Sequence, residues 1–154
     1  MIIDLKVTLA SRSPRRHFLL GQLVRELETV SLDTDESFDS SIPEEEVALV
    51  LAKRKMDDAL SRGIEGIIVT ADTIVVLDGH ILNKPADEAE ARKMLGMLSG
   101  NEHTVVTGFS VVNTETGRRI DSEAKTKVRF THLTKDEIDG YIATGSPYDK
   151  AGGY

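Results

Sequence analysis

Residues 9–16 read Leu9-Ala10-Ser11-Arg12-Ser13-Pro14-Arg15-Arg16, and we expect a strand to turn into a helix there. Before them, apolar residues alternate with polar ones as in a half-buried strand, at Leu5, Val7 and Leu9. Ser13 suits the N-cap position of a helix, and Pro14 suits its first turn. After them, apolar residues recur at helical spacing, at Leu19, Leu20, Leu23, Val24 and Leu27. The stretch therefore predicts a strand, a short loop and a helix that continues through these positions.

The same eight residues gather hydrogen-bond donors at one place. The first N–H groups of the predicted helix have no partner within the helix, and they lie at the positive end of its dipole. The hydroxyls of Ser11 and Ser13 add donors, and the guanidinium groups of Arg15 and Arg16 suit phosphate oxygens. The stretch therefore fits a polyphosphate-binding loop. A capped surface helix with two solvated arginines explains these eight residues equally well.

Composition narrows the classes of protein that remain. The chain has 154 residues, of which 40% are hydrophobic, so one domain over residues 1–154 is expected. The net charge of −7 argues against a general nucleic-acid partner. No cysteine is present, so disulfides and thiolate metal sites are excluded. No apolar run is long enough to cross a bilayer, and no signal-peptide pattern is found, so we expect a cytoplasmic protein without a membrane partner.

Helix and strand signals alternate along the rest of the chain. Ser41 and Glu44 form a predicted capping box for a helix over 41–62, which Gly63 should end. Further elements are expected as a strand over 67–77, a turn at 78–79, a return strand over 81–82, a helix capped at residue 87, strands over 104–112 and 120–130, and a helix capped at residue 134. This order predicts an α/β fold with a mixed, partly antiparallel sheet flanked by helices.

Two charged residues fall where apolar ones belong. Lys55 lies on the apolar stripe of the predicted 41–62 helix, so it must either extend to the edge of the core or meet an anion. Asp72 interrupts a β-branched strand, where a carboxylate needs a cation, a metal ion or several donors. It could be a structural ion pair, or it could bind a divalent metal or accept a proton from water. The charged residues off the stripe are expected to be solvated: Lys53, Arg54, Asp57 and Asp58.

Weaker candidates surround these two residues. Lys84 follows the return strand and could lie beside Asp72, or it could be an exposed loop lysine. Glu36 lies in an acidic loop and could complete a metal site with Asp72, although solvated charge is the simpler interpretation. Asp149 and Lys150 precede flexible glycines whose backbone could approach a substrate. The histidines lack metal-ligand spacing and are expected to be structural or on the surface: His17, His80, His103 and His132.

The order of these motifs resembles the Maf family of nucleoside triphosphate pyrophosphatases. The resemblance rests on residues 9–16, Asp35-Glu36, residues 51–55, residues 71–73, residues 83–85, residues 98–100 with His103, and residues 149–152. It implies a fold similar to that of inosine triphosphate pyrophosphatases and cleavage of a nucleoside triphosphate to the monophosphate and pyrophosphate. It also implies a divalent cation, Mg²⁺ or Mn²⁺, and a homodimer. Family members usually continue past the position of Tyr154, so the resemblance implies a chain truncated at its C-terminus.

The resemblance also assigns roles to the residues already found. Asp72 would be the proton acceptor, and Glu36 would join it in holding the metal ion. Lys55 and Lys84 would face the phosphates, and the triphosphate or nucleotide would be held by Ser11, Ser13, Arg15 and Arg16. Arg15 and Thr73 resemble the branch of the family that acts on dTTP and UTP. A nucleotide-binding regulator of cell division without catalysis is the alternative function.

Overall fold

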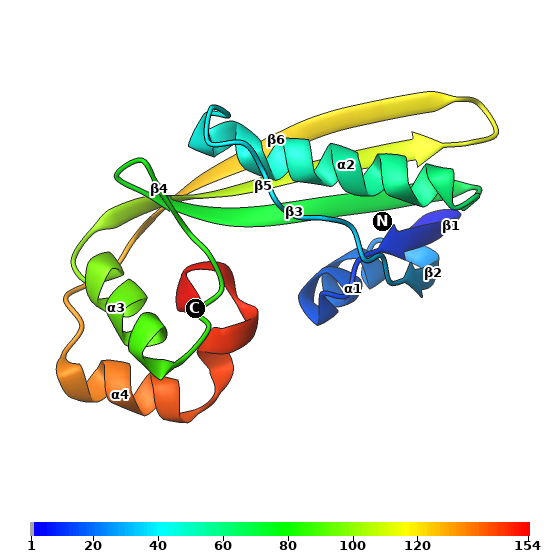
Figure 1. Cartoon of the computed structure of the whole chain (residues 1–154). Helices are drawn as coiled ribbons and strands as arrows, with labels where there is room; N and C mark the ends of the chain where they lie inside the picture. The colour runs from blue at the N-terminus through cyan, green and yellow to red at the C-terminus, as the bar shows by residue number, and fades with distance from the viewer. Residues whose placement is uncertain (1) are drawn as a thin grey trace. The chain divides into compact units, whose positions relative to one another are not determined.

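The computed structural model describes residues 2–154, which form two compact units (Figure 1). The first unit comprises the chain up to Asp72 together with Thr107–Glu123. The second unit comprises Thr73–Val106 together with Ala124–Tyr154. Strands β3 (Ile67–Leu77), β5 (Glu102–Asn113) and β6 (Arg118–Arg129) contribute residues to both units.

The sheet of the first unit contains a parallel βαβ arrangement. Strand β1 (Ile3–Ala10) leads into helix α1 (Pro14–Gly21), which returns the chain to strand β2 (Val24–Val30). Strand β1 pairs in parallel with both β2 and β3, and the order of strands is β2-β1-β3-β5-β6. The loop between β1 and α1 therefore lies beside the middle of β3. It follows the carboxyl end of β1, and ligands commonly bind at the carboxyl ends of strands in parallel sheets.

The first helix is shorter than the sequence predicted. It begins as expected, with Ser13 as its N-cap and Pro14 in its first turn, but it ends at Gly21. Val24 and Leu27, which fall at helical spacing, lie in strand β2, where Leu27 pairs with Val7. The prediction of a continuing helix is wrong because pairing with β1 satisfies this backbone as a strand, and tertiary contacts of this kind override local periodicity.

The predicted capping box at Ser41 is also wrong. A short 3₁₀ helix covers Glu44–Glu46, and helix α2 covers Val47–Ser61. The Ser41 N–H donates to the Asp39 carboxylate at 2.8 Å instead of starting a helix. Pro43 explains the late start, since a proline removes one N–H donor and disfavours the helical conformation in the residue before it. The helix ends before Gly63, which has a φ of 74°, as the sequence predicted.

Helix α2 packs closely on the sheet of the first unit (Figure 1). Its buried side chains are Val47, Ala48, Leu51, Ala52, Met56 and Ala59. The Thr70 hydroxyl on β3 donates to the Ala52 carbonyl at 2.7 Å. A Cβ atom on Gly108 of β5 would lie 2.4 Å from the carbonyl carbon of Ala48. Glycine at this position therefore lets the helix backbone touch the sheet, and this contact sets the depth at which α2 presents its other side chains.

The second unit confirms most of the elements predicted for it. Strand β3 ends at Leu77 and turns through Asp78 and Gly79, with φ angles of 48° and 73°, into the antiparallel strand β4 (His80–Leu82). This is the backbone of a two-residue hairpin. The remaining elements are α3 (Glu88–Leu98), α4 (Lys135–Ala143) and the 3₁₀ turns Ser146–Asp149 and Ala151–Gly153. Asp87 and Thr134 cap α3 and α4 as expected.

The predicted α/β class is confirmed, with a mixed sheet that is parallel around β1 and antiparallel between β3 and β4. Each unit has its own apolar core. In the first unit the core forms around Met56 and Ile68, and in the second it forms around Leu77 and Leu98. None of the helices within residues 2–154 combines the length and apolar character that crossing a bilayer requires.

An aromatic cluster in the second unit contains a buried histidine. His103 is 3% exposed, its ring packs edge-on against Phe130 and Tyr154, and its Nε2 lies 2.5 Å from the Tyr154 hydroxyl. Burial lowers the pKa of His103 from its ordinary value of 6.5. The structural role expected for this histidine agrees with its surroundings.

We expect this histidine to make the fold less stable in acid. Because its pKa is lower in the folded state, the unfolded chain binds the proton more readily, so stability is retained above about pH 6.5 and declines as the pH falls below it. Urea unfolding at about pH 7.5 and about pH 5.5 should therefore show a smaller pH-dependent loss for His103→Gln than for the unsubstituted chain. An equal loss in both proteins would contradict this assignment.

Candidate active site

The central feature of the first unit is a largely buried ion pair between Lys55 and Asp72. Lys55 leaves the buried face of α2, and its Nζ lies 2.7 Å from Oδ1 of Asp72 on β3. Each side chain is only 13% exposed. Of the two possibilities that the sequence left open for Lys55, the structure has the lysine meeting an anion rather than extending to the edge of the core.

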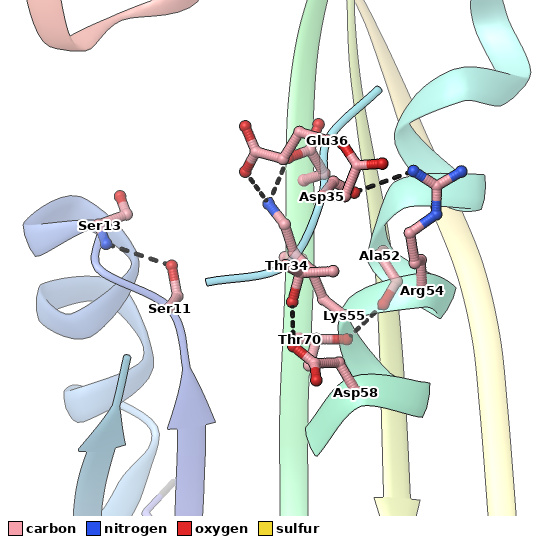
Figure 2. A network of polar contacts seen from close by, with 12 residues as sticks. Ser11, Ser13, Thr34, Asp35, Glu36, Ala52, Arg54, Lys55, Asp58 and Thr70 are labelled. Atoms are coloured by element: carbon pink, nitrogen blue, oxygen red, sulfur yellow. Dashed lines mark hydrogen bonds and ion pairs between the residues drawn. The ribbon is translucent and has the colours of Figure 1, made fainter. Parts of the chain in front are cut away.

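The same ammonium group also meets Glu36. Lys55 Nζ lies 2.8 Å from Glu36 Oε1, and the Glu36 side chain is 56% exposed (Figure 2). Glu36 belongs to an irregular segment that follows β2. The ammonium group therefore joins one buried carboxylate from the sheet and one solvent-facing carboxylate from a loop. The two acidic residues that the resemblance assigned to the site converge on one cation.

The surroundings of Asp72 favour a carboxylate that can take up a proton. Burial raises the pKa of Asp72, and the nearby Glu36 carboxylate raises it further. Lys55 and Arg16 oppose this effect and favour the ionised form. Carboxylic acids with a raised pKa are better proton acceptors once ionised, which is the usual requirement for a general base.

Arg16 links the loop between β1 and α1 to the strand that carries Asp72. Its Nη1 donates to the Ser11 hydroxyl at 3.2 Å and to the Ala71 carbonyl oxygen at 3.0 Å. Burial lowers the pKa of this guanidinium, while Asp72 acts in the opposite direction. Arg16 therefore contacts the residue directly before Asp72 and contributes a second positive charge to its surroundings.

The loop itself is organised by two serines. The Ser13 N–H donates to Ser11 Oγ at 3.2 Å (Figure 2). Ser13 Oγ accepts from the Arg16 N–H at 3.4 Å. Hydroxyl groups that accept hydrogen bonds can still donate their own proton to a ligand. Arg15 lies in the first turn of α1 and is exposed. The loop leads into the N-terminus of a helix, a place where anions commonly bind, and its role in holding phosphate stays a prediction.

Four predicted site residues belong to the second unit. Thr73 is its first residue, and Lys84 is exposed in the segment after β4. Lys150 Nζ lies 2.6 Å from Asp149 Oδ1 and donates to the Ser146 carbonyl at 2.6 Å. The cation and the carboxylate of this segment are therefore neighbours. Their roles, and the approach of Lys84 to Asp72, stay predictions.

The oxygen donors of the site suit a magnesium or manganese ion. Within residues 2–154 no three histidine, aspartate or glutamate side chains come together as a complete metal cage. Mg²⁺ does not need one, since it commonly binds through one or two carboxylates together with waters and substrate phosphates. Asp72 and Glu36 provide such a pair, because both lie against the same ammonium group. The residues present therefore fit this class of ion.

Two residues of α2 that were expected to be solvated hold residues 34–37, the irregular stretch that contains Glu36. Arg54, expected to be solvated, donates from Nη1 to the carbonyl oxygens of Asp35 and Ser37. Asp58, also expected to be solvated, accepts the Thr34 hydroxyl at 2.5 Å. The sequence showed that Arg54 and Asp58 lie near Lys55 on the same helix. It did not reveal their partners, because these are backbone carbonyl and hydroxyl groups of an irregular segment.

Comparison with known proteins supports the resemblance. Residues 6–154 match the family described as Maf-like protein. A relative from Geotalea uraniireducens, named dTTP/UTP pyrophosphatase, is 45% identical over 96% of this chain and 76% of its own length. A relative of the same name from Thermococcus gammatolerans is 42% identical over 96% of this chain and 77% of its own length.

Among solved structures, a HAM1 protein from Coxiella burnetii aligns with a TM-score of 0.48 and 14% identity, covering 81% of this chain and 72% of that one.

The family match extends over almost the whole chain, including every residue of the site described above. The chain therefore belongs to the Maf-like protein family.

Proposed function

We propose that this chain hydrolyses nucleoside triphosphates, dTTP and UTP above all, to the monophosphate and pyrophosphate. The observation that carries the proposal is the buried Asp72 carboxylate, which lies 2.7 Å from the Lys55 ammonium on a strand that Arg16 ties to the β1–α1 loop. The names of relatives more than 40% identical to the chain support the same activity and the same two nucleotides.

In this proposal the triphosphate lies against the N-terminus of α1. The hydroxyls of Ser11 and Ser13 and the guanidinium of Arg15 donate to phosphate oxygens, and Arg16 keeps the loop in place. Asp149, Lys150 and Thr73 would bind the remainder of the nucleotide. A divalent Mg²⁺ or Mn²⁺ held by Asp72 and Glu36 would neutralise charge on the phosphates when bound.

The chemical step is an attack by water on the α-phosphorus. Asp72 accepts a proton from the water, the water oxygen bonds to the α-phosphorus, and the bond to the bridging oxygen breaks. Pyrophosphate then leaves with the electron pair of that bond. Lys55 and Lys84 would stabilise the charge that develops on the phosphate oxygens, because positive groups fixed in advance lower the energy of such a transition state.

A nucleotide panel tests the proposal. The chain is incubated with dTTP, UTP, dCTP and ATP in the presence of Mg²⁺ or Mn²⁺, in water enriched in ¹⁸O. We expect pyrophosphate from dTTP and UTP, with the heavy oxygen in the monophosphate. Release of orthophosphate, or label in the pyrophosphate, would contradict attack at the α-phosphorus. Binding of dTTP without any turnover would favour the non-catalytic regulator of cell division.

We also propose that the protein acts in the cytoplasm as a homodimer, without nucleic-acid or membrane partners. The absence of cysteine accords with a reducing compartment, and the net charge of −7 opposes binding to nucleic acid. The family resemblance is the support for a dimer. Sedimentation of the purified chain should give twice the mass of one chain, and a sedimenting monomer at micromolar concentration would contradict the dimer.

A further inference from the structure

We propose that Arg54 is a positioning residue for the reaction, because it holds the segment that brings Glu36 to Lys55. The segment consists of residues 34–37 and is called the Glu36 segment below. This inference rests on the proposed function and extends it to a residue that does not touch the substrate. It follows from the contacts that the Glu36 segment makes with helix α2.

Arg54 binds the backbone on both sides of Glu36. Its Nη1 lies 2.9 Å from the Asp35 carbonyl oxygen (Figure 2). The same nitrogen also donates to the Ser37 carbonyl oxygen. These are the two carbonyl groups that flank Glu36 in the chain. Both contacts come from a single planar guanidinium, which holds its donors in a fixed geometry. Arg54 therefore holds the backbone on both sides of Glu36.

Glu36 lies in a solvent-facing, irregular part of the chain. Its side chain is 56% exposed, and the segment lies outside every helix and strand. The Asp35 carboxylate forms a local turn by accepting the Ser37 N–H at 2.9 Å and the Ser37 hydroxyl at 2.6 Å. These two bonds lie within the segment and do not join it to α2. Side chains of the segment also contact α2, from Thr34 to Asp58 and from Glu36 to Lys55.

The helix makes these contacts from neighbouring positions. Arg54 and Lys55 are consecutive residues of α2. Arg54 binds the backbone of the segment, and Lys55 forms an ion pair with the Glu36 carboxylate. Loss of the Arg54 guanidinium would leave two carbonyl groups to water and allow Glu36 to move away from Lys55. Small displacements of a catalytic group cost roughly ten- to a hundredfold in rate.

A double-mutant cycle tests whether Arg54 acts through Glu36. Arg54→Ala, Glu36→Gln and the double variant are compared by kcat/KM for pyrophosphate release from dTTP. We expect Arg54→Ala alone to lower this value roughly ten- to a hundredfold, and to lower it less than about threefold further in the Glu36→Gln background. An equal factor in both backgrounds would overturn the proposal.

Two further variants separate geometry from charge. Arg54→Lys keeps the positive charge but loses the planar fork, so we expect it to be intermediate between wild type and Arg54→Ala. Arg25→Ala is the matched control, since it removes the same charge from an exposed ion pair with Asp4 in the same unit. It should stay within about twofold of wild type. A loss in Arg25→Ala equal to that in Arg54→Ala would contradict a positional role.

Amide hydrogen exchange gives a measurement independent of activity. The Ser37 N–H is bonded within the Glu36 segment, so its exchange, followed by millisecond quench labelling, should speed up in Arg54→Ala and stay unchanged in Arg25→Ala. Unchanged exchange in Arg54→Ala would overturn the proposal. A wild-type chain that releases no pyrophosphate would refute the proposed function, and the exchange comparison would then decide the role of Arg54 by itself.

Discussion

The Lys55→Met variant is expected to lose about 3 kcal/mol of unfolding free energy, because it leaves the largely buried Asp72 carboxylate without its ion-pair partner. Lys55 and Asp72 are both 13% exposed, and their charged atoms lie 2.7 Å apart. Methionine fills a similar volume, so the lost stability reflects the uncompensated charge rather than a cavity. Activity should fall as well, because Lys55 also holds Glu36.

Urea unfolding of three variants checks this prediction. Lys53→Met makes the same chemical change at an exposed position two residues earlier in α2, and its unfolding free energy should stay within about 0.5 kcal/mol of wild type. Lys55→Met combined with Asp72→Asn removes both charges, so the double variant should be more stable than Lys55→Met alone. A double variant as unstable as the single one would show that Asp72 does not carry an uncompensated charge.

Turn and capping residues in the sequence correctly predicted the elements whose ends are stabilised by residues nearby in the chain. The hairpin at Asp78-Gly79 and the helix caps at Asp87 and Thr134 all formed as expected, because each is satisfied within a few residues. Strand β2 was missed for the opposite reason. Its backbone pairs with β1, and that pairing depends on the fold rather than on the spacing of Val24 and Leu27.

The same distinction between local and long-range signals explains which site residues were predicted. Lys55 and Asp72 were visible as charges at positions where the helix and strand patterns required apolar residues, and the structure pairs them. Arg54 lies off the apolar stripe, so nothing in the helical pattern distinguished it from a solvated arginine. Its partners are carbonyl groups of an irregular segment, and such groups carry no signal in the side-chain sequence.

The substitution with the largest expected effect on activity is Asp72→Asn. The amide has the shape of the carboxylate and still offers an oxygen to the Lys55 ammonium, so the fold should be retained. It cannot accept a proton from water at neutral pH, and loss of a general base typically costs 10²–10⁴-fold, so a fall in kcat of about this size is expected. Asp4→Asn, at a solvent-exposed aspartate of β1, is the matched control and should leave the rate unchanged.

Whether Asp72 accepts the proton is decided by the single-turnover rate of pyrophosphate release from dTTP, with enzyme in excess over nucleotide and Mg²⁺ present. The measurement compares wild type with Asp72→Asn at nucleotide occupancies confirmed by binding. We expect the variant to bind dTTP and to release pyrophosphate at about 1% of the wild-type rate or less. Equal rates in the two proteins would contradict the role of Asp72 as the group that accepts the proton from water.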